Sequence, residues 1–359
     1  MGAKQVKFEM VAAPAKGFAK PYPEKPEEPK GYMGFLVPGD EELFLGGGAL
    51  NGAVGQVLAQ AHAHADGAEE GTHEWTGFKY DRKSKQFSMQ GGLAEFDQDK
   101  CEYSKYQKKL FDAARQKKKC GKVHEATPKD MNEATPKDMN ETNPKDPAKP
   151  PLPVARSLCR VFTTDEHPFG AVFMHVLQAK ARPHDPKNFS VLYTVGVLGK
   201  NAKAPGEGEP KPGREKLVKK KAEDFVKVLY DTGANVVHVA NHYNTRKRTP
   251  QEPALERIRV PIVSGGTFRH PDVSAEWAAM ALLAGMQSVA YTSSQQLVVE
   301  LMPSPDMEGA LKQMAVQQEG ATPLKSITQV LESDKDEKKA KAFKLVVKGQ
   351  PRKCWLCCQ

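Results

Sequence analysis

Residues 257–286 read RIRVPIVSGGTFRHPDVSAEWAAMALLAGM, and this stretch decides the fold expected for the chain. Its β-branched residues predict a short buried strand that contains Ile258, Val260, Ile262 and Val263. Ser264-Gly265-Gly266 predicts a turn, because glycine adopts backbone angles that cost other residues energy. Asp272 or Ser274 is placed to cap a following helix, in which apolar residues recur at helical spacing: Ala278, Ala281, Leu282, Gly285 and Met286.

A strand, a glycine turn and a helix N-terminus in series can bind an anionic ligand. Unpaired backbone N–H groups point outward at such a place, and the helix dipole favours negative charge. An ordinary strand–turn–helix unit without a ligand fits the same residues. The local pattern leaves both interpretations open.

The turn resembles a loop of a known family. Residues 261–271, PIVSGGTFRHP, are similar without a gap to the second phosphate loop of macrodomains, P-x-I-S-T-G-[IV]-[YF]-G-x-P. The resemblance implies an ADP-ribose site in which the N–H groups of residues 264–266 hold the diphosphate and Phe268 packs on the distal ribose. The implied ligand-binding residues of this loop are Ser264, Gly265, Gly266, Thr267, Phe268 and Arg269.

Two positions of this loop depart from the family pattern. Gly265 stands where the family has Thr, and Arg269 stands where it has Gly. The Arg269 side chain either fills the ligand groove or pairs with a phosphate, and the sequence leaves both possibilities open.

A second glycine loop occurs at residues 46–56, GGGALNGAVGQ. Three glycines let a backbone approach a ligand closely, and the residues from 54 to 61 are expected to form a helix behind them. The run resembles the first ligand loop of macrodomains, and more closely the G-G-G-x-L-N-G-A of poly(ADP-ribose) glycohydrolase relatives. That resemblance implies that Gly46, Gly47, Gly48 and Asn51 contact the ligand.

The same resemblance argues against hydrolysis. The glycohydrolase relatives carry two Glu after a Gln, whereas Val57 and Leu58 follow Gln56 here. Those acids protonate and stabilise the departing ribose, and neither Val nor Leu ionises. The Asn that precedes the glycines in most macrodomains is also missing. We therefore expect no enzymatic activity, no catalytic residue and no cofactor.

The composition limits the partners, the covalent or metal sites and the location that can be expected for the chain. The chain has 359 residues, a net charge of +9 and only 39% apolar residues, so part of it is expected to lie outside a packed core. Its charge favours acidic partners such as nucleic acid or an acidic protein surface. Its six cysteines suggest neither a disulfide framework nor a complete zinc site, and no apolar run is long enough for a membrane span. An intracellular location, cytoplasmic or within a cytoskeletal or organellar assembly, is expected.

The organisation expected along the chain has five parts. Residues 1–30 are a Pro/Lys/Glu-rich arm that is expected to be disordered or extended, and residues 31–123 hold the first glycine loop and an insertion. Residues 124–153 form a linker that contains an eight-residue repeat, and residues 154–330 form the macrodomain-like core. Residues 331–359 are a charged tail.

Several elements are expected within these parts. Strands are expected at residues 31–37, 43–45, 169–179, 189–197 and 296–301, and a hairpin at 72–97. Helices are expected at residues 99–119, 215–244 and 307–317. The first of these helices should bury a narrow apolar face and expose its lysines to solvent; that face consists of Tyr103, Tyr106, Leu110 and Phe111.

The predicted fold is a three-layer α/β arrangement with a mixed, macrodomain-like sheet and helices on both faces. Two functions are consistent with it. The first is non-catalytic binding of ADP-ribose or a related nucleotide diphosphate. The second is a structural role in a large intracellular assembly, in which basic and proline-rich arms bind neighbouring subunits.

Overall fold

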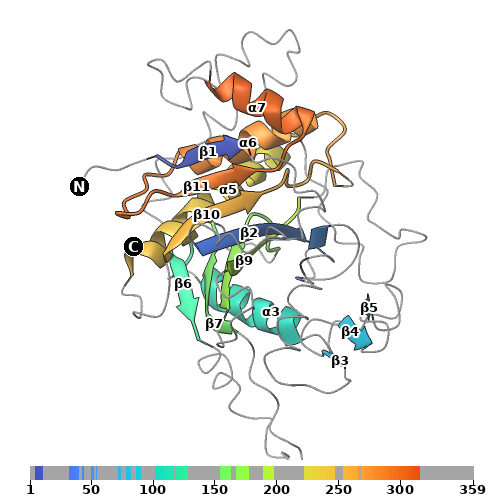
Figure 1. Cartoon of the computed structure of the whole chain (residues 1–359), viewed down its shortest axis with the longest axis vertical. Helices are drawn as coiled ribbons and strands as arrows, with labels where there is room; N and C mark the ends of the chain where they lie inside the picture. The colour runs from blue at the N-terminus through green and yellow to red at the C-terminus, as the bar shows by residue number, and fades with distance from the viewer. Residues whose placement is uncertain are drawn as a thin grey trace, which may run out of the picture.

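The computed structural model describes residues 5–10, 32–39, 43, 50–51, 54, 72–73, 78–81, 86–89, 102–116, 119–127, 154–162, 167–177, 189–197, 222–246, 254–266 and 268–315. Within these residues, eight strands form one sheet in the order β1-β11-β10-β2-β9-β8-β7-β6 (Figure 1). Neighbouring strands are parallel from β1 to β9 and antiparallel from β9 to β6.

The parallel part contains the strands β1 (Lys7–Met10), β11 (Val298–Leu301), β10 (Leu255–Val260), β2 (Tyr32–Gly39) and β9 (Phe189–Val195). The antiparallel part adds β8 (Val172–Leu177), β7 (Val154–Arg160) and β6 (Val123–Ala126). A separate three-stranded sheet contains β3 (Thr72–His73), β4 (Phe78–Asp81) and β5 (Gln86–Met89).

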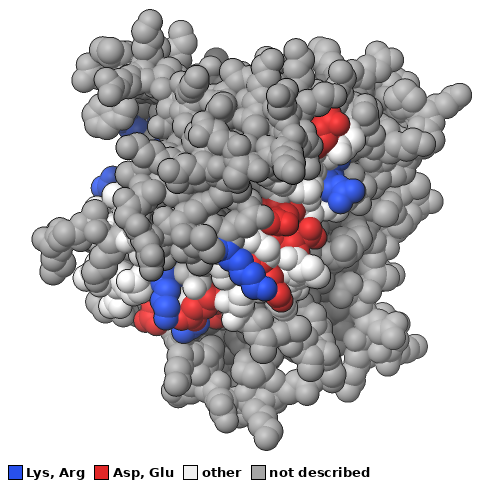
Figure 2. All heavy atoms as spheres, turned by 90° about the horizontal axis from the view of Figure 1, so that it is seen from above, with Lys and Arg blue, Asp and Glu red and all other residues white. Residues whose placement is uncertain are grey.

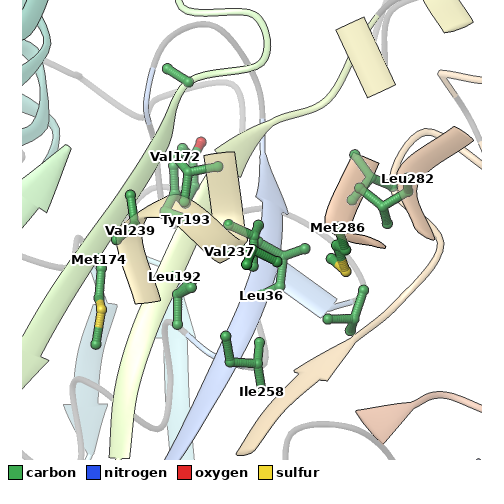
Figure 3. Close-up of a cluster of buried hydrophobic side chains, with 14 of the residues drawn as sticks. Leu36, Val172, Met174, Leu192, Tyr193, Val237, Val239, Ile258, Leu282 and Met286 are labelled. Atoms are coloured by element: carbon green, nitrogen blue, oxygen red, sulfur yellow. The ribbon is translucent and has the colours of Figure 1, made fainter. Parts of the chain in front are cut away.

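Helices cover both faces of the large sheet. The helices α5 (Ala222–Thr245) and α6 (Ala275–Gln287) lie on one face, with α7 (Pro305–Ala315) packed against α6. Between them and the sheet lies an apolar core that includes Leu36, Leu192, Ile258, Val237 and Met286 (Figure 3).

Neighbouring residues of β7 show that α3 (Glu102–Arg115) lies on the opposite face. Arg156 stacks over the ring of Tyr243 in α5 at 4.9 Å. The next residue, Ser157, bonds to His175, whose ring meets Tyr103 of α3 at a centroid distance of 5.0 Å. Consecutive strand residues point to opposite faces, so the sheet is the middle of three layers. The predicted α/β class with a mixed sheet is confirmed.

The helices α5 and α6 cross at two glycines. A Cβ added to Gly233 would overlap the carbonyl oxygen of Leu282, and one added to Gly285 would overlap that of Tyr230. The two backbones therefore touch where side chains normally separate helices. The close approach to α5 and the packing of α7 leave α6 almost fully buried, with 12 of its 13 residues buried.

An ionic network binds the first strand to the sheet. Arg257 of β10 lies 3.3 Å from Glu9 of β1 and 3.0 Å from Glu300 of β11. Arg259 also pairs with Glu300 at 3.0 Å. Residues 1–30 were expected to be a disordered or extended arm, and Lys7–Met10 of this arm form an extended strand, which needs no core of its own because β11 supplies backbone partners.

Other element boundaries also differ from the sequence prediction. β10 ends at Val260, so Ile262 and Val263 lie after the strand rather than in it. Pro261 accounts for this early end, because proline has no N–H group to continue the ladder. Leu43 is not in a strand and has a left-handed φ of 60°. Residues 124–126 of the expected linker belong to β6, which pairs with β7, a strand that was not predicted.

The remaining elements that can be compared match their predictions closely. β4 and β5 form the expected hairpin, and α3 buries its four predicted apolar residues while Lys105, Lys108 and Lys109 are exposed. α5, α6, α7, β2, β8, β9 and β11 lie where strands and helices were expected. The helix expected at residues 54–61 is described only at Val54, which is helical. The glycines at 46–48 and the residues from 316 to 359 lie outside the described residues.

Candidate ligand-binding edge of the sheet

Three parallel strands end together at one edge of the sheet. The N–H group of Gly196, just after β9, donates to the carbonyl oxygen of Gly39 at the end of β2 over 2.6 Å. The N–H group of Val197 donates to the hydroxyl oxygen of Ser264, in the loop after β10, over 2.7 Å. Open α/β sheets bind ligands at the carboxyl ends of their strands, so this edge is the candidate site.

Ser264 joins two of these strand ends. It is buried and has a left-handed φ of 55°, a conformation that is uncommon for any residue except glycine. The strained backbone places its hydroxyl group against Val197. The predicted site residue Ser264 is therefore at the edge, where its side chain holds the loop in place.

The two following glycines have different surroundings. A Cβ at Gly265 would overlap the side chain of Ile262, so this position requires glycine for packing. A Cβ at Gly266 would have no atom within 4 Å, and Gly266 is exposed. The Gly266 carbonyl accepts a hydrogen bond from the N–H group of Arg269 over 2.9 Å, which closes the turn. Gly266 is thus the open position of the loop.

Phe268 lies over the end of β9. A Cβ on Gly196 would be 3.2 Å from the Phe268 ring and 3.4 Å from the Ser264 hydroxyl. The glycine at position 196 therefore allows the loop to lie close to the strand end. The structure brings Ser264, Gly265, Gly266 and Phe268 together around this point.

Arg269 is exposed beside the same turn. Among the described residues it forms no ion pair with Asp272 or Glu276, the two partners that its position suggests. The Glu276 carboxylate lies instead next to Gly309 of α7, 2.8 Å from where a Cβ would be. The guanidinium group is therefore not held away from the edge by either acid.

The loop continues into α6 through a residue that the sequence analysis did not single out. His270 is buried, and its Nδ1 accepts a hydrogen bond from the Asp272 N–H group over 3.1 Å. Ser274 then caps α6 by accepting a bond from the Trp277 N–H group over 3.2 Å, which selects Ser274 over Asp272 as the cap. His270 stands between Arg269 and Pro271, at a position that is variable in the family pattern. The sequence therefore offered little reason to single it out.

Most of the first glycine loop lies outside the described residues, and this applies to Gly46, Gly47, Gly48, Val57 and Leu58. The same holds for Thr267 of the loop at residues 261–271. Asn51 is described and is helical, as are Leu50 and Val54. Asn51 was expected in a loop, and that expectation is wrong because the helix begins before Val54.

The titratable groups with the largest pKa shifts lie away from this edge. Burial lowers the pKa of His175, beneath α3, to about 3. Hydrogen bonding by His242 and Arg156 lowers the pKa of Glu125, in β6, to about 2. The part of the chain that the structure describes contains no group of three potential metal ligands and no helix long and apolar enough to cross a membrane.

No known protein-family model matches the chain. The DNA/RNA-binding protein ALBA4 of Plasmodium falciparum (isolate 3D7) is 23% identical over 276 residues, which cover 75% of this chain and 56% of that protein. The chain thus spans little more than half the length of this curated relative.

Among solved structures, the chain is similar to two of a macrodomain from Oceanobacillus iheyensis. The form with bound MES has a TM-score of 0.23 and 13% identity over 42% of this chain and 55% of that one. A mutant form has a TM-score of 0.24 and 14% identity over 48% and 64% of the two chains. The α/β class rests on the sheet topology described above.

Proposed function

We propose that the edge formed by β2, β9 and the loop at residues 261–271 binds a nucleotide diphosphate of the ADP-ribose type. The observation that supports this most is the convergence of Gly39, Gly196 and Ser264 through two backbone-donated hydrogen bonds. Gly266, with open space around it, is the point where a diphosphate would approach the backbone. Arg269, with five donors and a permanent charge, would lie beside it.

The proposed binding is not catalytic. Val57 and Leu58 occupy the positions at which glycohydrolase relatives have acids, and the strongly shifted groups among the described residues lie elsewhere. We therefore expect no release of ADP-ribose from its polymer above a buffer blank. Turnover would show that another carboxylate serves, with Glu41 and Glu42 the first to replace.

Calorimetry with ADP-ribose tests the proposal. We expect a dissociation constant in the micromolar range, about −8 kcal/mol. Replacement of Arg269 by Gly should weaken binding by roughly 1.5–3 kcal/mol, because a hydrogen bond to a charged group is lost. Tighter binding by Arg269→Gly would instead mean that the arginine closes the groove. An absence of heat from folded protein at high ligand concentration would reject the proposal.

A second candidate is binding to nucleic acid. Its support is the net charge of +9 and the 23% identity over 276 residues to a protein described as DNA/RNA-binding. A basic protein in a large assembly, bound to acidic partners, would have the same charge. Binding to a labelled oligonucleotide at physiological salt distinguishes nucleic-acid binding from binding to acidic proteins. A protein that contacts only acidic polypeptides would leave the oligonucleotide free.

A further inference from the structure

The helix α3 lies in one of several strongly basic segments of the chain. Residues 102–122 contain eight basic and two acidic residues, a net charge of +6. The described part of this segment is α3 and the turn that follows it, with Lys105, Lys108, Lys109 and Lys122 exposed. We call these four lysines the α3 basic face.

The α3 basic face has a fixed position on the molecule. The opposite side of α3 is buried against the sheet through the rings of Tyr103 and Tyr106, which lie 5.0 and 5.7 Å from the ring of His175. Gln107 adds a hydrogen bond from its side-chain N–H group to the carbonyl oxygen of Leu43 over 2.8 Å. The lysines are therefore presented by a docked helix, which lowers the entropic cost of forming several contacts at once.

Three lysines of this face have no carboxylate partner among the described residues. Asp112 pairs with Arg115 at 3.3 Å, and the described residues give no carboxylate partner to Lys108, Lys109 or Lys122. On the face of the molecule shown in Figure 2, by contrast, described acidic and basic side chains lie beside one another. Helical residues three and four apart are neighbours about 5–6 Å apart, so Lys105, Lys108 and Lys109 form one compact row of charges.

We propose that the α3 basic face binds the phosphate backbone of nucleic acid without reading its sequence. The inference rests on the second candidate function above and assigns it a surface. A row of lysines supplies point charges for phosphates but no planar fork for base edges, so affinity should be independent of sequence and steeply dependent on salt. The carboxyl edge that ends β2 and β9 is a different part of the fold, so the two sites are tested separately.

The test is fluorescence anisotropy of the full chain with a labelled oligodeoxythymidine and a DNA duplex of equal length, between about 50 and 200 mM salt. The variant is Lys108→Gln with Lys109→Gln. The matched control is Arg246→Gln with Lys312→Gln, which removes the same charge from exposed positions at the end of α5 and in α7. Circular dichroism should show both variants folded, because all four positions are exposed.

We expect the α3 variant to reduce the slope of log K against log salt by about 1.8 for the duplex and about 1.4 for the single strand. The control should keep the wild-type slope, and both variants should bind ADP-ribose as the wild type does. Equal losses in both variants, or displacement by polyglutamate at equal charge concentration, would overturn the proposal in favour of net charge or an acidic protein. No binding by the wild type would overturn the second candidate function as well.

Discussion

Ser264 shows how a single residue organises the candidate edge. Its left-handed backbone would be less strained as glycine, yet its hydroxyl group accepts the bond from the fully buried Val197 N–H group. An unpaired buried N–H group costs about 1–3 kcal/mol, whereas the left-handed conformation costs roughly 1–2 kcal/mol for a residue with a Cβ. The hydrogen bond from Val197 is therefore large enough to offset the strain, which accounts for serine at this position.

Two substitutions at Ser264 separate these effects. Ser264→Ala loses the hydrogen bond and keeps the strain, so we expect a loss of about 1–3 kcal/mol in the free energy of unfolding. Ser264→Gly also loses the bond but relieves the strain, so it should be about 1 kcal/mol more stable than the Ala variant. Urea unfolding of both proteins measures the difference. If Ala proved the more stable of the two, the backbone of residue 264 would not be left-handed in solution.

His175 gives the fold a dependence on pH. Burial lowers its pKa from 6.5 to about 3, and its neighbours Ser157, Tyr103 and Tyr106 carry no charge. As the pH falls below 6.5, His175 becomes protonated in the unfolded chain, whereas the buried ring of the folded chain stays neutral. The stability due to neutral His175 is therefore complete above pH 6.5 and is lost progressively toward pH 3, by roughly 2 kcal/mol at pH 5.

Replacing the ring tests this assignment. In His175→Gln, the difference in unfolding free energy between pH 7 and pH 5 should shrink by about 2 kcal/mol relative to the wild type. His238, whose pKa burial lowers to about 4, remains in both proteins and cancels from the comparison. The assignment fails if the two proteins lose the same free energy between these pH values.

At the scale of the element, the contact of α5 with α6 limits what the helices can contain. Ala at position 233 or 285 would raise helix propensity by about 1 kcal/mol, but its Cβ would overlap a backbone carbonyl of the facing helix. We expect Gly233→Ala and Gly285→Ala each to lower the melting temperature, with a net cost of roughly 1–3 kcal/mol from overpacking.

Gly309 of α7 is the matched control for that prediction. The three atoms nearest to a Cβ there belong to the carboxylate of Glu276, at 2.8–3.0 Å, and this carboxylate is the far end of a flexible side chain. Gly309→Ala should therefore be neutral or stabilising by up to about 1 kcal/mol. If Gly285→Ala left the melting temperature unchanged while Gly309→Ala lowered it, the close contact would not lie between α5 and α6.

Helices and strands with a regular spacing of apolar residues were predictable from the sequence. Strands that depend on pairing with residues far away in the chain were not. The periodicity of Tyr103, Tyr106, Leu110 and Phe111 placed α3 on the sheet. β1 has only four residues; Lys7 pairs with Glu9 inside the strand, whereas the pair of Glu9 with Arg257 forms only when β10 lies near it in the sheet. Pairing of that kind between residues far apart in the chain leaves no local pattern.

The same limit applied to the candidate site. The loop from Ser264 to Arg269 was predictable because its residues are consecutive, and Ser274 because helix caps have a local signature. The role of Gly196 was not, since it depends on Phe268 and Ser264 approaching from another strand. The contact of Glu276 in α6 with Gly309 in α7 was not predictable either, because it joins two separate helices. This contact leaves Arg269 without Glu276 as a partner.

At the scale of the whole molecule, the sheet supports two surfaces of different character. Its carboxyl edge presents backbone groups and small residues, while α3 on one face presents lysines. A ligand with two phosphates suits the first, and an extended polyanion suits the second. The central claim is that the loop from Ser264 to Arg269 holds the smaller ligand.

Calorimetry of ADP-ribose with Gly266→Glu and Gly266→Gln, beside the wild type, tests that claim most directly. Position 266 has open space for a side chain, so both variants should fold with wild-type stability. The account predicts micromolar binding by the wild type, weaker binding by the Gln variant because of its bulk, and none by the Glu variant because its charge repels the diphosphate. Equal binding by all three proteins would contradict it, since the ligand would then lie away from this loop.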